Sequence, residues 1–178
     1  MAGLQSKNGV KTWDFEFIGT SVSDPAGRTY ASSEVFPNFV SNLAEIADYV
    51  FRFCIVSEVV ARRVAIVCHG STAGIRVGTD HITEATLEQF STAFKKLGLV
   101  MVPGIAVLEL YACQVGQNRA LLRAISNLMD GTAVIAYEQN QPASGGGNGK
   151  IAKCKLDKCT AIQPRHRKKH KGSAAPLK

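Results

Sequence analysis

Two apolar, strand-like segments of the chain each end on a side chain that can take part in nucleophilic catalysis. Residues 64–68 lead directly into His69 and Gly70, and residues 105–112 lead directly into Cys113. Parallel strands of an open α/β sheet end at one edge, and such sheets build their sites there. A thiol with an imidazole base beside it is an activated nucleophile. The pattern therefore predicts a dyad made by His69 and Cys113.

Backbone donors near these residues would complete such a site. Gly70 allows the chain after His69 to approach a substrate closely, and its N–H and that of Cys113 could hold an oxyanion. A helix that is predicted to begin near Asn118 would favour a thiolate at Cys113 through its N-terminal dipole. A thiol, a base and oxyanion donors are the parts that cysteine acyl transfer needs.

The elements that must position these residues alternate between strands and helices. Apolar patterns predict strands over residues 12–18, 64–68, 105–112 and 132–137. Helical patterns occupy residues 41–51, 83–98 and 118–131, with Asn42 or Ser41 as a cap of the first and Gly98 as the end of the second. This alternation favours an α/β fold whose mostly parallel central sheet is flanked by helices on both faces.

Composition narrows the classes of protein further. The chain has 178 residues, of which 46% are apolar, and no apolar run is long enough for a membrane-spanning helix. Its first eight residues lack the apolar core of a signal peptide. Five cysteines, an odd number scattered through apolar segments, are typical of mostly buried thiols in a reducing compartment. We therefore expect a cytoplasmic protein without membrane contact.

Charge is distributed unevenly along the chain. Residues 1–149 contain 11 Lys/Arg and 13 Asp/Glu, whereas residues 150–178 contain 10 Lys/Arg and one acid. The sequence predicts a loose leader over residues 1–11, an α/β domain over 12–140, and a Gly-rich linker with a basic, disordered tail over 141–178. The tail would contact polyanions in a salt-sensitive manner, so a nucleic-acid-associated protein acting through it is an alternative function.

Residues 64–137 resemble the caspase-like cysteine peptidase clan, which includes caspases, gingipains, clostripain, separases and bacterial CHAT domains. The matching blocks are VAIVCHG at 64–70 and LELYACQVG at 108–116, and they are most similar to CHAT-like proteins. The resemblance implies a three-layer caspase-like fold and a cysteine endopeptidase, hence a hydrolase and thiol protease. His69 and Cys113 would be its dyad, Gly70 an oxyanion donor, and a protein or peptide its substrate. That chemistry requires no metal and no organic cofactor.

The chain departs from the patterns that set specificity in this clan. Caspases have Gln-Ala-Cys at the nucleophile, and metacaspases have Asp two positions before it, where this chain has Tyr111. Neither preference for the P1 residue is therefore implied. Asp24 and Arg28, in the loop after the first strand, are candidates for substrate binding. A catalytically silent caspase-like module that binds a partner protein is a further alternative.

Other residues of a reactive type have competing interpretations. Cys68 should point to the opposite face of its strand from His69, into the core. His81 is either a second base or an exposed position. Cys154 and Cys159, with His166 and His170 beyond them, have a spacing at the edge of the range for a zinc site, but no finger core is evident.

Overall fold

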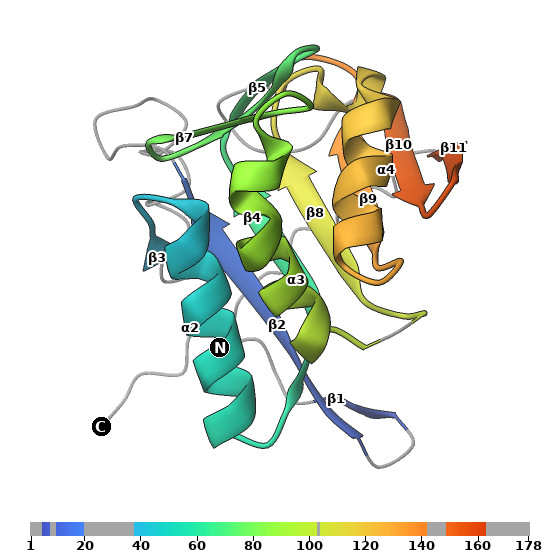
Figure 1. Cartoon of the computed structure of the whole chain (residues 1–178). Helices are drawn as coiled ribbons and strands as arrows, with labels where there is room; N and C mark the ends of the chain where they lie inside the picture. Colours follow the sequence, from blue (N-terminus) through green and yellow to red (C-terminus); the bar gives the residue numbers. More distant parts are fainter. Residues whose placement is uncertain (1–4, 8–9, 20–37, 103, 142–148, 163–178) are drawn as a thin grey trace, which may run out of the picture.

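The computed structural model describes residues 5–7, 10–19, 38–102, 104–141 and 149–162 of the chain. Its main sheet contains the strands β1 (Gln5–Lys7), β2 (Val10–Ile18), β3 (Asn38–Phe39), β4 (Val60–Val67), β8 (Val107–Tyr111), β9 (Ala133–Tyr137), β10 (Ile151–Lys155) and β11 (Lys158–Ile162). Their order is β1-β2-β4-β8-β9-β10-β11, with β3 also paired to β2 (Figure 1). The four central strands β2, β4, β8 and β9 are parallel, whereas β10 and β11 continue the sheet in antiparallel fashion. The protein is thus a mixed α/β protein with a parallel sheet centre.

The helices of the described chain lie on one face of this sheet, in front of it in Figure 1. They are α2 (Leu43–Val56), α3 (Ser91–Val100) and α4 (Arg119–Leu128), together with the short 3₁₀ helices η1 (Leu87–Phe90) and η2 (Val115–Gln117). Alternate strand residues such as Phe15, Val64 and Leu108 pack against them in the main core. The helices expected on the other face do not occur among the described residues.

Side-chain caps start two of these helices. Asn42 accepts the backbone N–H of Glu45 at 2.9 Å, and the Glu45 carboxylate accepts the N–H of Ser41, the residue before the cap, at 2.8 Å, an arrangement related to a capping box. Asn118 accepts the N–H of Leu121 at 3.0 Å at the start of α4. The sequence predicted both starts correctly, because Asn accepts hydrogen bonds from the unpaired N–H groups of a first helical turn.

Gly98 does not end its helix, contrary to the sequence prediction. α3 continues to Val100. A Cβ added at Gly98 would lie 2.9 Å from the Cα of Met129, so the glycine allows α3 to approach the end of α4 closely. The residue is needed for helix packing and not as a stop.

A second, smaller sheet follows β4 directly. It consists of β5 (His69–Ser71), β6 (Gly74–Val77) and β7 (Asp80–Thr83), all antiparallel. Ile75, Val77 and Ile82 are buried in the main core, so one face of this sheet packs on the protein. In Figure 1 it lies across the carboxyl ends of β4 and β8. The three strands therefore place the residues that follow His69 next to this edge of the main sheet.

The domain limits predicted from composition are wrong at both ends. The expected loose leader 1–11 contains β1 and the start of β2. The expected tail contains β10 and β11, and β10 pairs with β9 over four residue pairs. Ala152 and Cys154 are fully buried in the core, so the folded body extends to Ile162. Residues 142–148 and 163–178 of the predicted linker and tail lie outside the described part.

No helix in the described part of the chain is long and apolar enough to span a membrane.

Candidate active site

The register of β4 and β8 aligns the ends of the two strands. Val67 is paired with Tyr111, and the N–H of Cys68 donates to the carbonyl oxygen of Tyr111 at 3.1 Å. β4 ends at Val67 and β8 at Tyr111, each two residues before His69 and Cys113 respectively, so the register carried two residues further predicts that His69 lies beside Cys113. The predicted strands are therefore neighbours and parallel, and they end at one edge of the sheet.

Alternation of side chains predicts the same side for both residues. Cys68 and Ala112 belong to the core on the helix-covered face, whereas Val67 and Tyr111 belong to a small cluster on the opposite face. Successive residues of a strand point to opposite faces. Alternation carried past the strand ends therefore predicts that His69 and Cys113 share the face that Tyr111 occupies. His69 is exposed and Cys113 partly exposed, as a site open to substrate requires.

Gly70 lies directly against the chain around Cys113. A Cβ at Gly70 would come within 2.7 Å of the Ala112 Cβ and 2.9 Å of the carbonyl oxygen of Cys113. Real Cβ atoms do not approach so closely, so only glycine permits β5 to pack here. The glycine that the sequence analysis singled out thus allows the close approach of the two strand ends.

The segment that follows β9 also contacts Cys113, and the sequence did not predict this contact. After β9, the N–H of Gln141 points at the sulfur of Cys113 with a distance of 3.3 Å. The carbonyl oxygen of Gln139 accepts the N–H of Gln114 at 3.2 Å. Composition made Gln141 the first residue of the predicted linker, and nothing in the sequence marks its contact with the thiol.

The helix that was expected to act on Cys113 does not follow it directly. α4 begins at Arg119, six residues after Cys113. The segment between them contains η2, whose N-cap residue Gln114 has a positive φ of 57°. The predicted cap at Asn118 is confirmed, and an effect of the helix dipole on the thiol stays a prediction.

The other two free thiols of the described chain, Cys54 and Cys68, are buried and therefore poor nucleophiles. Burial raises the pKa of Cys54 to about 11, and burial together with the nearby Cys113 raises the pKa of Cys68 to about 12. Cys68 lies in the core, as its position in the strand predicts. Cys113 is the only free cysteine of the described chain that is not buried.

The hydroxyl of Tyr111 is part of a hydrogen-bonded network with Arg63 and Glu109. It donates to the carboxylate of Glu109 at 3.0 Å and accepts from the guanidinium of Arg63 at 3.1 Å. Arg63 also contacts Glu109 at 2.5 Å. Burial lowers the pKa of Arg63, but the charge of Glu109 and the contact with Tyr111 outweigh it and raise that pKa. This network joins β4 and β8 on the face of the sheet opposite to the helices.

The remaining candidates of the sequence analysis fall in different places. Asp24 and Arg28 lie outside the described residues. His81 is exposed in β7 and is the cross-strand partner of Arg76. In the described part of the chain, no group of three or more His, Cys, Asp or Glu side chains could hold a metal ion.

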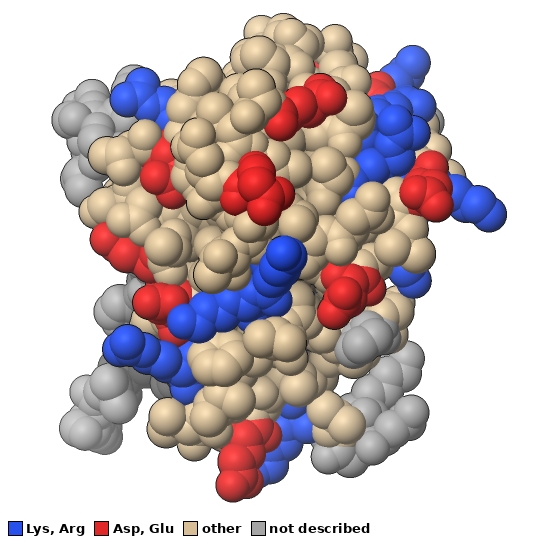
Figure 2. Space-filling model, in the orientation of Figure 1, with Lys and Arg blue, Asp and Glu red and all other residues tan. Residues whose placement is uncertain are grey.

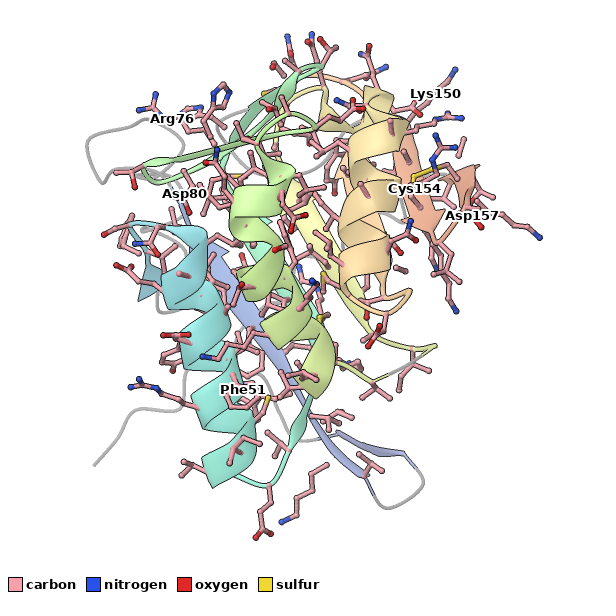
Figure 3. All side chains as sticks on the ribbon, viewed as in Figure 1. Phe51, Arg76, Asp80, Lys150, Cys154 and Asp157 are labelled. Carbon is pink, nitrogen blue, oxygen red and sulfur yellow. A yellow bond between two sulfur atoms is a disulfide. The ribbon has the colours of Figure 1, made fainter. Side chains whose placement is uncertain are left out.

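Cys154 and Cys159 are not zinc ligands here but a disulfide. They are direct partners across the β10–β11 hairpin, and Figure 3 shows their bond beside α4. His166 and His170 lie outside the described residues. The sequence analysis missed this bond because it read the two cysteines as part of a tail. Disulfides are uncommon in reducing compartments, so this pair does not fit the expectation from cysteine count.

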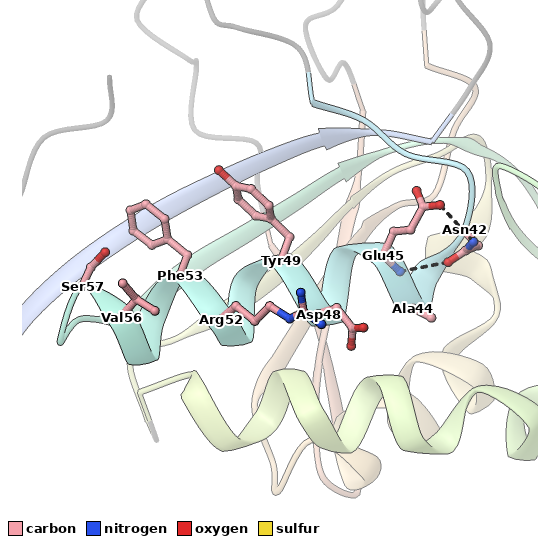
Figure 4. A pocket seen from close by; sticks show the side chains of 9 residues that line it. All are labelled: Asn42, Ala44, Glu45, Asp48, Tyr49, Arg52, Phe53, Val56 and Ser57. Atoms are coloured by element: carbon pink, nitrogen blue, oxygen red, sulfur yellow. Dashed lines mark hydrogen bonds between the residues drawn. The ribbon is translucent and has the colours of Figure 1, made fainter.

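Two cavities of the described chain lie on α2. One, about 660 Å³, is a groove along α2 between Asn42 and Ser57, with Tyr49, Phe53 and Val56 in its wall (Figure 4). Another, about 390 Å³, lies between α2 and α3. Neither is lined by His69 or Cys113.

Lysine side chains gather at the edge of the main sheet that β10 and β11 form. Lys150, Lys153, Lys155 and Lys158 are exposed on or beside the β10–β11 hairpin, with Asp157 the one acid among them. Figure 2 shows Lys and Arg side chains gathered over this part of the molecule. The described portion of the predicted polyanion-binding segment 150–178 thus belongs to the folded body.

The fold and the edge geometry define a mixed α/β protein with a histidine and a cysteine at neighbouring strand ends. Residues 32–168, more than three quarters of the chain, match the family described as "Domain of unknown function (DUF4347)", and the chain belongs to this family. A comparison with curated proteins finds no match.

Proposed function

We propose that the protein is a cysteine endopeptidase of the caspase-like type, with His69 and Cys113 as its dyad. The observation that supports this proposal is the parallel register of β4 and β8, which pairs Val67 with Tyr111, each two residues before one of the two reactive residues. The three-layer caspase-like architecture is part of the proposal. The parallel sheet centre, with a small antiparallel sheet between β4 and the next helix, supports it.

The proposed reaction follows from the residues at this edge. The sulfur of Cys113 attacks the scissile carbonyl carbon and forms a C–S bond, while its proton passes to the imidazole of His69. The C–N bond then breaks, and the leaving amine takes that proton. Water, deprotonated by His69, attacks the acyl-enzyme and releases the acid and the thiol. Protons and electron pairs balance without a metal or cofactor.

Backbone N–H groups at the same edge suit the oxyanion. The two-residue turn at Thr72 and Ala73 closes the pair Ser71 and Gly74, and hydrogen-bonded pairs alternate along an antiparallel ladder. Gly70 therefore occupies a non-hydrogen-bonded pair, and its N–H points away from β6. This supports its role as an oxyanion donor together with the N–H of Cys113.

Cleavage of a mixed peptide library, read out by mass spectrometry, tests the proposal. We expect Cys113→Ala and His69→Ala each to lower the rate by at least about 10³-fold while the fold is retained. Cys54→Ala is the matched control, because it also removes a thiol but lies in α2, and it should keep the activity. A folded wild-type protein that cleaves no peptide, under conditions that reduce Cys113, would instead favour a silent interaction module.

A further inference from the structure

The short segment after β9 contacts the proposed nucleophile with main-chain groups. We name residues 138–141 the strap. The N–H of Gln141 donates to the sulfur of Cys113 at 3.3 Å. The carbonyl oxygen of Gln141 lies farther from that sulfur, at 3.9 Å. The shorter of the two contacts is therefore the one in which the sulfur is the acceptor.

Hydrogen bonds join the strap to the turn that follows Cys113. The N–H of Gln114 donates to the carbonyl oxygen of Gln139 at 3.2 Å. The side-chain amide of Gln117 donates to the carbonyl oxygen of Glu138 at 2.7 Å. Because the strap and the turn are bonded at two places, the position of the strap is fixed relative to the sulfur.

A glycine allows this turn to pack against the end of β9. A Cβ at Gly116 would lie 2.7 Å from the carbonyl oxygen of Ala136 and 2.9 Å from the nitrogen of Glu138. Real Cβ atoms do not approach backbone atoms so closely. The start of the strap is therefore held by main-chain packing as well as by hydrogen bonds.

Glu138 anchors the strap to two further elements. Its N–H donates to the carbonyl oxygen of Lys150 at 2.9 Å, next to the paired strands β9 and β10. Its carboxylate accepts from the guanidinium of Arg119, the first residue of α4, at 3.0 Å. The side chain of Arg119 is 47% exposed. Since ion pairs with such exposure add little stability, removal of this one should shift the strap without unfolding the protein.

A hydrogen-bond donor at this place acts on the form of cysteine that attacks. The thiolate is the nucleophile, and hydrogen bonds to an ionised acceptor are about twice as strong as those between neutral groups. The N–H of Gln141 therefore binds the sulfur most strongly when the sulfur is charged. It also fixes the orientation of the reacting group, on which the rate of attack depends.

We infer that the main-chain N–H of Gln141 holds the charged sulfur of Cys113 for attack, and that Glu138 is a positioning residue that keeps this N–H in place. The inference rests on the proposed peptidase function. It adds to that function a donor for the nucleophile itself, distinct from the N–H groups assigned to the oxyanion.

Alkylation of Cys113 by iodoacetamide tests the donor without requiring cleavage. Gln141→Pro removes the N–H, whereas Gln141→Ala keeps it. At about pH 7.5 we expect Gln141→Pro to label about 10-fold more slowly, as for loss of a hydrogen bond to a charged group, and Gln141→Ala to lose far less. At about pH 10.5, where thiols are ionised, Gln141→Pro and the wild type should agree within about twofold. A change in access alone would slow labelling equally at both pH values, and circular dichroism checks the fold.

Glu138 provides a second test, which decides the matter if Gln141→Pro does not fold. Glu138→Ala should slow labelling about two- to fivefold at about pH 7.5, because a partly exposed ion pair contributes modestly. Glu138→Gln keeps an acceptor for Arg119 and should restore most of the rate. Glu88→Ala, at an exposed glutamate of η1, is the matched control and should leave the rate unchanged. In peptide cleavage, Glu138→Ala should lower kcat while KM stays within about twofold.

The outcomes separate the strap from the proposed activity. Cleavage by the wild type, together with equal labelling of the wild type and Gln141→Pro at both pH values, would overturn the inference and leave the peptidase standing. Slower labelling of Gln141→Pro at the lower pH alone, in a protein that cleaves nothing, would support the donor and overturn the peptidase. Faster labelling of Gln141→Pro or Glu138→Ala would mean that the strap shields the sulfur, and would overturn the inference. A Glu138→Ala rate equal to that of the wild type would overturn the role of Glu138.

Discussion

The segment after β8 and the β10–β11 hairpin both contain cysteine. The sulfur is a free thiol in the first region and part of a disulfide in the second. Cys113 follows a parallel strand, remains a partly exposed thiol and receives the N–H of Gln141. Cys154 and Cys159 face each other across an antiparallel pair and are oxidised to a disulfide. Parallel strands bring the ends of distant segments together, so they create a site. A hairpin pairs neighbours in sequence, so it is suited to a local cross-link.

The two regions also differ in what their loss would do. The residues around Cys113 lie at an edge and contribute chemistry, whereas β10 contributes core. Ala152 and Cys154 are fully buried, and Ala152 pairs with Ala136 of β9. We therefore expect changes in the hairpin to act on stability, and changes at Cys113 to act on reactivity.

The largest effect should come from a charge placed in β10. Ala152→Asp buries a carboxylate without a partner in the core, which costs several kcal/mol, so we expect it to lower the free energy of unfolding by at least about 3 kcal/mol. Lys153→Asp is the matched control one residue further on, where the side chain is exposed, and its effect should stay within about 0.5 kcal/mol. Urea unfolding followed by circular dichroism measures both. Equal, small effects would mean that residues 150–162 are the dispensable tail that composition predicts.

The contrast between the two regions explains what the sequence could and could not predict. The strands before His69 and Cys113 are mostly apolar, so their existence and parallel pairing could be predicted from the pattern alone. β10 and β11 are short and half polar, with a positive φ of 51° at Leu156 in their turn. Hairpin turns usually place Gly or Asn at such a position, so Leu156 gave no turn signal.

The same reasoning accounts for the parts of the site that were missed. Gln141 follows β9 near the place where β10 pairs with that strand, and the N–H of Glu138 donates to the Lys150 carbonyl oxygen at 2.9 Å there. Tertiary pairing of distant strands left no local signal for Gln141 in the sequence.

The second effect in size concerns thiol reactivity. At pH 7.5, iodoacetamide should label Cys113 at least about 100-fold faster than Cys54 or Cys68. The pKa values of the two buried thiols are raised to about 11 and about 12, and each unit lowers the reactive thiolate tenfold below its ordinary level. Because raised values mean less thiolate below them, labelling of Cys54 and Cys68 should increase as the pH rises toward these values. Mass spectrometry of tryptic peptides measures each rate.

A result in which Cys68 reacts first would contradict the burial of that residue in the core. Labelling of all three thiols at equal rates would indicate that the protein opens globally during the reaction. The unfolded protein in urea provides the reference, since there the three thiols should react alike.

The third effect is that of the hairpin disulfide. Replacement of both Cys154 and Cys159 by Ser should lower the free energy of unfolding by about 2 kcal/mol, since closure of a loop of about six residues removes little entropy from the unfolded chain. Dithiothreitol should have the same effect on the wild type and none on the double variant. Melting curves with and without the reductant measure this. A wild type that is indifferent to dithiothreitol would mean that the two thiols are not joined in solution.

The smallest effect tests whether the two regions communicate through α4. This helix begins at Arg119 with Asn118 as its cap, and the carbonyl oxygen of Arg119 lies 3.8 Å from the sulfur of Cys159, so α4 connects the segment after Cys113 to the hairpin. Asn118→Ala removes the cap and should cost about 1 kcal/mol of stability, whereas Asn118→Ser, which keeps an acceptor, should cost less. The labelling rate of Cys113 should change by less than about twofold in both variants, because the dipole of α4 does not reach a residue six positions before its first turn. A marked slowing in Asn118→Ala but not in Asn118→Ser would restore the helix start as an activator of the thiol. The two regions would then act as one unit, with the hairpin supporting the helix that tunes Cys113.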